Sequence, residues 1–221
     1  MNAQSEIAEA KTETKNGMFL SVMETFYSIQ GEGFHTGIPA FFIRMGGCDV
    51  GCYWCDVKES WEAENYPMKS MDEIISEVKK SKPKRIIVTG GEPLMYNLTE
   101  LTKKLKSVIH PSGGGGALHL ETSGAYPLTG EWDWICFSPK KFKEPLPEFY
   151  SEAHELKMII YNKNDFKFAE KNSKYVKDDC VLFFQPEWSR REAMLPSIIE
   201  YVKQNPRWRI SLQTHKYIGV R

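Results

Sequence analysis

Short apolar segments alternate with amphipathic ones through most of this chain, and this alternation limits the folds open to it. Residues 85–89 (RIIVT) form an apolar run typical of a strand buried on both faces. Ser70 and Glu73 have the spacing of a capping box, and the apolar residues after Ser70 recur at helical spacing, which predicts a helix over 71–80. Strands that alternate with helices predict an α/β fold with a parallel sheet and right-handed crossovers.

The same patterns assign most of the remaining chain. Further strands are predicted at 19–26, 39–44, 117–121, 134–138, 155–161, 180–185 and 208–213, and further helices along Leu98, Leu101, Leu105 and Val108, at 164–176 and at 189–204. Pro196 is expected to kink or interrupt the last helix, because proline lacks a backbone donor. The loop 111–116 carries four successive glycines and is expected to be flexible.

The 221 residues are consistent with one ample domain. Residues 1–16 are polar and lack aromatic side chains, which predicts a flexible tail, and residues 17–221 contain no repeat and no second domain boundary. The first thirty residues contain no apolar signal segment, and no apolar run approaches the roughly 18 residues that span a bilayer. We therefore expect a cytoplasmic protein that does not bind a membrane.

The charge balance bears on the class of ligand. Lys and Arg total 29 and Asp and Glu total 29, so the formal net charge is zero. A neutral chain is not built around a general polyanion-binding surface, although a local basic pocket remains possible. We expect no catalytic contact with nucleic acid.

Polar and glycine-rich segments directly follow five of the predicted strands. These segments are 89–93 (TGGEP), 121–124 (ETSG), 138–140 (SPK), 185–186 (QP) and 213–215 (QTH). The carboxyl ends of parallel strands meet at one edge of a sheet, where ligands of such folds bind. The sequence therefore predicts one composite site at that edge.

Three of the five cysteines, Cys48, Cys52 and Cys55, lie within eight positions in a C-x3-C-x2-C pattern. Three thiolates on a short loop can bind three irons of a cuboidal iron–sulfur cluster and leave the fourth iron open. A structural zinc ion is the alternative, but it would need a fourth ligand nearby, and His35 lies well upstream. The other two cysteines stand in apolar surroundings and are expected to be inert core thiols; they are Cys136 and Cys180.

This cysteine pattern, followed about 35 residues later by Gly-Gly-Glu-Pro, resembles the radical S-adenosylmethionine (SAM) superfamily. The resemblance implies a [4Fe–4S] cluster whose open iron binds the amino and carboxylate groups of SAM. It also implies that Gly90, Gly91 and Glu92 contact the SAM amino group. Glycines allow close approach of the backbone, and a carboxylate suits an ammonium group, so the residue types agree with these roles.

The flanking segments are similar to the 7-carboxy-7-deazaguanine synthase family of that superfamily. The similar segments are 28–33 (SIQGEG), 42–44 (FIR), Asp56 after the cysteines, 121–124, 138–140 and 213–216 (QTHK). The resemblance covers residue 18 to the C-terminus and implies a modified partial TIM-type barrel. It also implies a carbon–nitrogen lyase that converts 6-carboxy-5,6,7,8-tetrahydropterin to 7-carboxy-7-deazaguanine with loss of ammonia, in the biosynthesis of queuosine and other 7-deazapurines.

The resemblance assigns roles to individual positions, with no catalytic residue beyond the cluster and the SAM radical. Cluster ligands are Cys48, Cys52 and Cys55; SAM-binding residues are Gly90, Gly91, Glu92, Glu121, Ser123, Ser138, Pro139, Lys140 and Gln185; substrate-binding residues are Ile29, Gln30, Gly31, Glu32, Arg44, Thr89, His215 and Arg221. Arg44 also stands out by itself, because a guanidinium among apolar strand residues is costly if it is buried without a partner.

One position departs from the family pattern. The family commonly has Thr or Ser after Asp56, where the hydroxyl binds a magnesium ion beside the substrate carboxylate, but this chain has Val57. Magnesium requires hard oxygen ligands. The ion is expected to be held by substrate oxygens and water alone, or to be replaced or absent.

The resemblance also implies partners: an electron donor such as flavodoxin or ferredoxin, and a second copy in a homodimer. Two alternative functions remain at this stage. A radical SAM activase of a glycyl-radical protein would share the size and cysteine spacing, and a zinc- or cluster-binding module would not be an enzyme.

Overall fold

The computed structural model describes residues 19–109 and 115–221, so the predicted tail at 1–16 and most of the glycine loop lie outside the described residues. One nine-stranded sheet organises this part of the chain, in the order β3-β1-β2-β4-β5-β6-β7-β8-β9. The strands are β1 (Phe19–Ile29), β2 (Pro39–Met45), β3 (Met68–Ser70), β4 (Arg85–Gly90), β5 (Ala117–Thr122), β6 (Trp134–Phe137), β7 (Glu155–Ile160), β8 (Val181–Pro186) and β9 (Trp208–Ile210).

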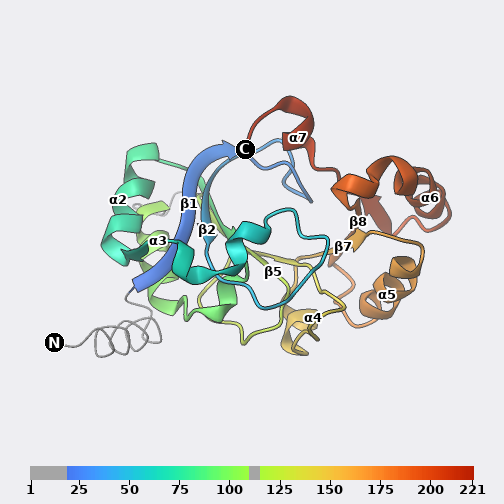
Figure 1. The fold of residues 1–221 in the computed structure, drawn as a ribbon, viewed down its shortest axis with the longest axis horizontal. Coiled ribbons are helices and arrows are strands. Elements are labelled where there is room, and N and C mark those ends of the chain that lie inside the picture. The colour runs from blue at the N-terminus through green and yellow to red at the C-terminus, as the bar shows by residue number, and fades with distance from the viewer. Residues whose placement is uncertain (1–18, 110–114) are drawn as a thin grey trace.

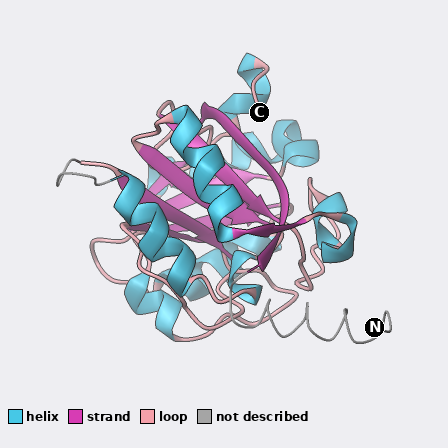
Figure 2. Ribbon diagram, turned by 90° about the vertical axis from the view of Figure 1, so that its left-hand side faces the viewer, coloured by secondary structure: helices cyan, strands magenta, loops and turns pink. Residues whose placement is uncertain are grey.

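Strands β2 and β4 to β9 are mutually parallel, and β1 lies antiparallel between β2 and β3. The helices that connect or follow them are α2 (Met71–Ser81), α3 (Thr99–Ile109), α4 (Glu148–Glu152), α5 (Asn164–Ser173), α6 (Arg191–Gln204) and α7 (Thr214–Ile218). The strands gather at the centre of the molecule with helices along their outer side (Figure 2). This is the mostly parallel, partial-barrel α/β fold that the sequence predicted.

Local signals explain the boundaries of α2. The Ser70 side chain accepts a hydrogen bond from the Glu73 amide, the Glu73 side chain accepts one from the Ser70 amide, and the helix ends at Lys82 in the left-handed conformation. Its buried residues, among them Ile74 and Val78, pack into the main core. The predicted capping box and helix are therefore confirmed.

The structure corrects two predictions about the last elements. Pro196 does not interrupt the last helix, because it lies inside α6, which continues to Gln204. Met194 and Ile198, on either side of the proline, are buried and stabilise the helix through this position. Strand β9 has three residues, not the six predicted for 208–213, because the chain leaves the sheet toward the loop after β1.

The period of two along each parallel strand divides its side chains between two environments. On β7, Leu156, Met158 and Ile160 belong to the core beneath the helices, whereas Glu155 and Lys157 line the barrel interior. The same division recurs on neighbouring strands, which place Arg44, Thr89, Glu121, Cys136 and Gln185 on the interior side. The interior is thus polar, although these strands read as apolar runs.

In the described part of the chain, strands β9 and β1 do not pair, and the C-terminal segment after β9 bonds to the loop after β1 across this gap. The Thr214 amide donates to the Gly31 carbonyl at 2.9 Å, and the Gly33 amide donates to Ser211 Oγ at 2.9 Å. Figure 1 shows α7 and the C-terminus beside the end of β1. These bonds join residues about 180 positions apart and close the wall of the barrel around its interior. Among the described helices, none has the length and apolar character needed to cross a bilayer.

Candidate active site

A pocket of about 250 Å³ opens at the carboxyl ends of the parallel strands. Its lining contains nearly every residue that the sequence singled out: Ile29, Gln30, Gly31, Glu32, Arg44, Cys48, Cys52, Cys55, Thr89, Gly90, Gly91, Glu92, Glu121, Ser123, Ser138, Lys140, Gln185, His215 and Arg221. Pro139 does not line it. The composite site predicted from the strand ends is therefore one pocket.

All three clustered cysteines line this pocket, on the loop after β2. The Cys55 amide donates to the Cys52 carbonyl at 2.8 Å, and the Val57 amide donates to Cys55 Sγ at 3.4 Å. Burial raises the pKa of Cys48, and it raises the pKa of Cys52 to about 11, so both thiols lose protons most readily to a bound metal. Soft sulfur donors on one tight loop fit an iron–sulfur cluster.

Among residues 19–109 and 115–221, no three His, Cys, Asp or Glu side chains converge as the ligands of a single ion would. In a cuboidal cluster each thiolate binds a different iron, so its ligands are spread around the cluster. Cys136 and Cys180 are both buried, and burial raises the pKa of each, that of Cys180 to about 12. Cys136 nevertheless lines the pocket, a placement that its apolar sequence surroundings did not indicate.

The Gly-Gly-Glu-Pro loop lies directly against the cysteine loop. The Gly91 amide donates to the Met45 carbonyl at 3.0 Å, and the Glu92 amide donates to the Gly47 carbonyl at 2.9 Å. A Cβ atom on Gly91 would lie 2.2 Å from the Gly47 carbonyl oxygen and 2.9 Å from the Cys48 Cβ. Only glycine permits this approach.

Glu92 is 1% exposed, and donors of the chain hold its carboxylate. Thr122 Oγ1 donates to Oε1 at 2.6 Å, and the Ser123 amide and hydroxyl donate to Oε2 at 2.8 and 2.5 Å. The Leu94 amide adds a fourth bond at 3.2 Å. The carboxylate therefore keeps one orientation along the pocket wall, which suits a partner that carries an amino group.

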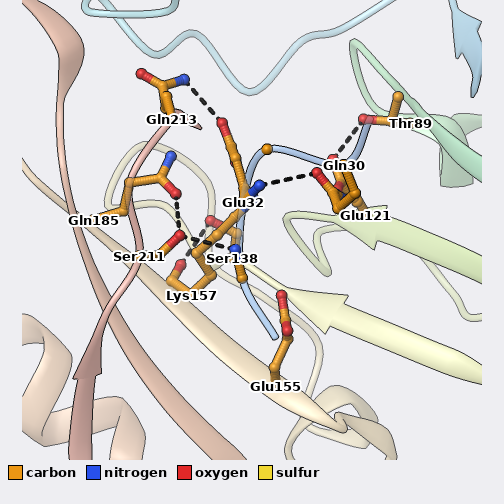
Figure 3. A network of polar contacts seen from close by, with 12 residues as sticks. Gln30, Glu32, Thr89, Glu121, Ser138, Glu155, Lys157, Gln185, Ser211 and Gln213 are labelled. Atoms are coloured by element: carbon orange, nitrogen blue, oxygen red, sulfur yellow. Dashed lines mark hydrogen bonds and ion pairs between the residues drawn. The ribbon is translucent and has the colours of Figure 1, made fainter. Parts of the chain in front are cut away.

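Glu121 lies between two residues predicted to bind the substrate, although the resemblance assigned it to SAM. Gln30 Nε2 donates to its Oε1 and Thr89 Oγ1 donates to its Oε2, each at 2.9 Å. Figure 3 shows these three side chains together. Lys140, by contrast, bonds to Ser138, its neighbour in the same predicted SAM segment, at 2.7 Å between Nζ and Oγ.

The Arg44 guanidinium has a partner in the chain. Its Nε donates to Glu24 Oε1 at 2.9 Å, and its terminal end lies over the Phe26 ring. Glu24 also pairs with the guanidinium of Arg221, at 3.0 Å. Arg44 is therefore paired within the chain, so its burial does not by itself require a ligand. The residue still lines the pocket, and the bond to Glu24 fixes its position there.

His215 packs against the loop after β1. A Cβ atom on Gly31 would lie 2.2 Å from His215 Nδ1, so the two residues are in close contact. Burial lowers the pKa of His215, and the nearby Glu32 carboxylate opposes this effect. The loop after β1 and the C-terminal segment thus form one side of the pocket together.

A buried ion pair that the sequence did not indicate completes this side. Lys157 of β7 is 5% exposed, and its ammonium contacts the Glu32 carboxylate. Gln213 Nε2 donates to Glu32 Oε1 at 2.9 Å. Burial by itself would raise the pKa of Glu32, but Lys157 and Gln213 lower it to about 2. Figure 3 shows Glu32 reaching between these two partners.

Three kinds of comparison place this architecture among known proteins. A family model described as the Radical SAM superfamily matches residues 42–137. A 7-carboxy-7-deazaguanine synthase from Flavobacterium psychrophilum is 54% identical over 212 residues, which cover 96% of this chain and 98% of that protein. The protein of the same name from a Synechocystis species is 48% identical, over 90% of this chain and 93% of its own.

A structural relative is more distant in sequence. The crystal structure of QueE from Escherichia coli matches with a TM-score of 0.75 at 26% identity, and the match covers 91% of this chain and 96% of that one. Fold, pocket and sequence similarity therefore lead to one family.

Proposed function

This chain belongs to the 7-carboxy-7-deazaguanine synthase family of the radical SAM superfamily, and on that premise we propose that it converts 6-carboxy-5,6,7,8-tetrahydropterin to 7-carboxy-7-deazaguanine with release of ammonia. The reaction is a step in the biosynthesis of queuosine. One observation carries the proposal: a single pocket joins the cysteine trio and the Gly-Gly-Glu-Pro loop to the polar residues after β1.

The cysteine trio would hold a [4Fe–4S] cluster, and residues 90–92 with Ser123, Ser138, Lys140 and Gln185 would hold SAM. When bound, these groups supply the hydrogen-abstracting radical chemistry of the superfamily, and the protein supplies binding and orientation. Glu92, fixed by Thr122 and Ser123, would accept a hydrogen bond from the amino group of SAM. Lys140, whose pKa burial lowers, lies beside Ser138 on the same wall.

The opposite wall would orient the substrate. Glu32 and Glu121 present carboxylate oxygens, which only accept hydrogen bonds and so suit the N–H groups of an aminopyrimidinone. Arg44, held by Glu24, and His215 offer donors to the carboxylate and carbonyl oxygens of the substrate. A site that matches donors to acceptors in this way rejects ligands that leave its buried groups unpaired.

The test is anaerobic reconstitution with iron and sulfide, followed by incubation with SAM, a strong reductant and 6-carboxytetrahydropterin. Mass analysis is expected to find 7-carboxy-7-deazaguanine and ammonia in equal amounts. Cys48→Ala should abolish the product, whereas Cys180→Ala, which changes a cysteine outside the pocket, should retain it. A loaded wild-type cluster that yields no product would contradict the proposal and would favour an activase.

The residues after the third cysteine do not fit a magnesium ion. Val57 offers no side-chain oxygen, and Asp56 is engaged by Lys216 Nζ at 2.6 Å and by Gln213 Nε2 at 3.1 Å. Lys216 thus already places a positive charge beside this carboxylate. Of the alternatives that the sequence left open, we therefore propose the one in which the ion is absent, so that turnover by this chain does not require magnesium.

Activity assays with and without magnesium, on the wild type and on Val57→Thr, test this independence. Chelation should leave the wild-type rate within about twofold, whereas the Val57→Thr variant, which restores an oxygen ligand, should gain a response to the ion. Strong stimulation of the wild type by magnesium would contradict the prediction.

A homodimer and a small electron-transfer protein, flavodoxin or ferredoxin, belong to the same proposal. Exposed apolar side chains support a protein interface, among them Tyr217 and Ile218 on α7, which are 57% and 60% exposed. Light scattering on the reconstituted protein should give twice the chain mass of 25.5 kDa. A monomer at working concentration would contradict the dimer and leave the chemistry intact.

A further inference from the structure

Lys157 of β7 is a buried cation, 5% exposed, beside Glu32, a residue predicted to bind the substrate. It stands in a strand that otherwise reads as apolar (ELKMII), and its ammonium contacts Glu32 across 125 residues of chain. A lysine in such a place loses hydration and rotamer freedom, which the fold tolerates only with charged partners. Its acidic neighbours, Cys136 and the carboxylates of Glu32, Glu121 and Glu155, raise its pKa against the effect of burial.

The two oxygens of Glu32 have separate partners. Oε2 accepts from Lys157 and Oε1 accepts from Gln213 Nε2 at 2.9 Å. Gln213 Nε2 also donates to Asp56 at 3.1 Å, and its Oε1 accepts from Lys216 at 3.2 Å. This pattern fixes the orientation of the amide, because carboxylates only accept and an ammonium only donates. Each Glu32 oxygen still has a lone pair for a ligand in the pocket.

Glu121, the neighbouring carboxylate, is also held by hydrogen-bond donors of the protein. Gln30 Oε1 accepts a hydrogen bond from the Glu32 amide at 3.1 Å, and Gln30 Nε2 donates one to Glu121. In this part of the pocket, Glu32 and Glu121 therefore present carboxylate acceptors, and neighbouring side chains of the protein hold each of them in place. Acceptors in this arrangement recognise a ligand edge that carries several N–H groups, as the 2-amino-4-oxopyrimidine ring does.

We propose that Lys157 is a positioning residue that keeps Glu32 an ionised acceptor, and that it thereby selects ligands with an N–H donor edge. Lys157 lines the same pocket as Glu32, and its ammonium is bonded to Glu32 Oε2, through which it acts on the ligand. Without the ammonium, a buried Glu32 becomes protonated and offers the ligand a hydrogen-bond donor. The 2-amino edge of the ligand, which also carries donors, then faces a donor in place of an acceptor. The inference rests on the proposed function and names a determinant of specificity in the same site.

Other titratable groups also face this pair. They are His215 from α7 and Asp56 from the cysteine loop toward Glu32, and Cys136, Glu121, Glu155 and Lys140 toward Lys157. A change in pH acts on all of them, so the effect of Lys157 has to be separated from theirs. A Glu32→Gln background does this, because it removes the titration of Glu32 and leaves the other groups in place.

The experiment measures binding of the product, 7-carboxy-7-deazaguanine, by calorimetry without reductant, together with KM and kcat, on Lys157→Met, Glu32→Gln and the double variant. Lys157→Met should weaken binding and raise KM about 10- to 100-fold at pH 7, the range of a hydrogen bond to a charged group, with a smaller change in kcat. Binding should recover as the pH rises and Glu32 ionises.

The double variant should bind as weakly as Glu32→Gln and no more weakly, because Lys157 acts only through Glu32. The double variant lacks the uncompensated carboxylate at position 32, so this comparison remains decisive if Lys157→Met does not fold. Additive losses in the double variant, or a pH-independent defect in Lys157→Met, would overturn the inference. Failure of the wild type to bind or turn over would instead overturn the proposed function.

A 2-oxo analogue of the product, which lacks the amino group, adds a second criterion. The wild type should bind the 2-amino ligand more tightly than the 2-oxo analogue. Lys157→Met should reduce the ratio of the two affinities, whereas Lys157→Arg, which retains a cation, should keep most of that ratio. An unchanged preference in Lys157→Met would contradict a role in specificity.

Discussion

The two sides of the pocket are held together by different kinds of bonds. On the cluster side, defined here as residues 46–57 with 90–93, a backbone bond holds the two loops against each other, from the Glu92 amide to the Gly47 carbonyl. On the substrate side, defined here as residues 29–33, Lys157 and 211–215, side chains from distant segments meet, as Lys157 and Gln213 do at Glu32. Backbone bonds need short, glycine-containing motifs, whereas side-chain bonds need only single residues.

This difference predicts that substitutions on the two sides have different effects on cluster content and ligand affinity. A backbone-held loop fails as a unit when its close approach is blocked, because no side chain can rotate away. A side-chain network loses ligand affinity while the rest of the site persists. The predictions below test the contrast, beginning with the largest effect.

Gly91→Ala should disable the cluster side. The added Cβ would lie 2.2 Å from the Gly47 carbonyl oxygen, so the cysteine loop has to shift. A displacement of about 1 Å in an active site can cost on the order of 100-fold in rate, and we expect at least that loss of turnover. Iron and sulfide content after reconstitution should fall as well.

Gly115→Ala is the matched control for this substitution, since an added Cβ there meets no atom within 4 Å. It should keep both metal content and turnover. A fully loaded, fully active Gly91→Ala variant would show that the cysteine loop does not depend on this contact.

Gly31→Ala should damage the substrate side alone. Its Cβ would lie 2.2 Å from His215 Nδ1, which displaces the C-terminal segment from the loop after β1. We expect KM to rise about 10-fold or more, from the loss of preorganised contacts, while iron and sulfide content stay at the wild-type level. Parallel loss of cluster and affinity would contradict the independence of the two sides.

The smallest effect concerns the histidines beneath the substrate side, at a small cavity that also touches Gln30 and Glu32. Burial lowers the pKa of His119 to about 3 and that of His35 to about 4, against 6.5 in the unfolded chain. The unfolded state therefore binds more protons between pH 6.5 and these values. Stability from these groups is full above pH 6.5 and falls as the pH drops toward 4 and then 3.

Urea unfolding at pH 7.5 and pH 5 measures this loss. His119→Gln removes one titrating group and keeps an acceptor for Arg85, which donates to His119 Nε2 at 3.0 Å. The variant should lose less stability than the wild type between the two pH values. An equal loss would assign the acid sensitivity to other groups.

The motifs of the cluster side could be recognised from the sequence, because their determinants are local. The spacing of the cysteines and the Gly-Gly-Glu-Pro loop can be read without knowledge of the fold, and the structure places both motifs in one pocket. The substrate side was predicted less completely. Lys157 was missed, although a charge inside an apolar strand was the same signal that drew attention to Arg44. Even at Arg44 that signal did not reveal the partner, Glu24.

The sequence by itself determined the order of most strands and helices, the capped helix α2 and the three-cysteine motif, since each depends on periodicity or spacing over about ten residues. The tertiary structure alone decided which side chains of each strand face the barrel interior and how they pair. The Glu32–Lys157 and Glu32–Gln213 bonds join residues 125 and 181 positions apart. No local preference encodes such pairs, because they form only when parallel strands take their register and the C-terminal segment closes the barrel wall.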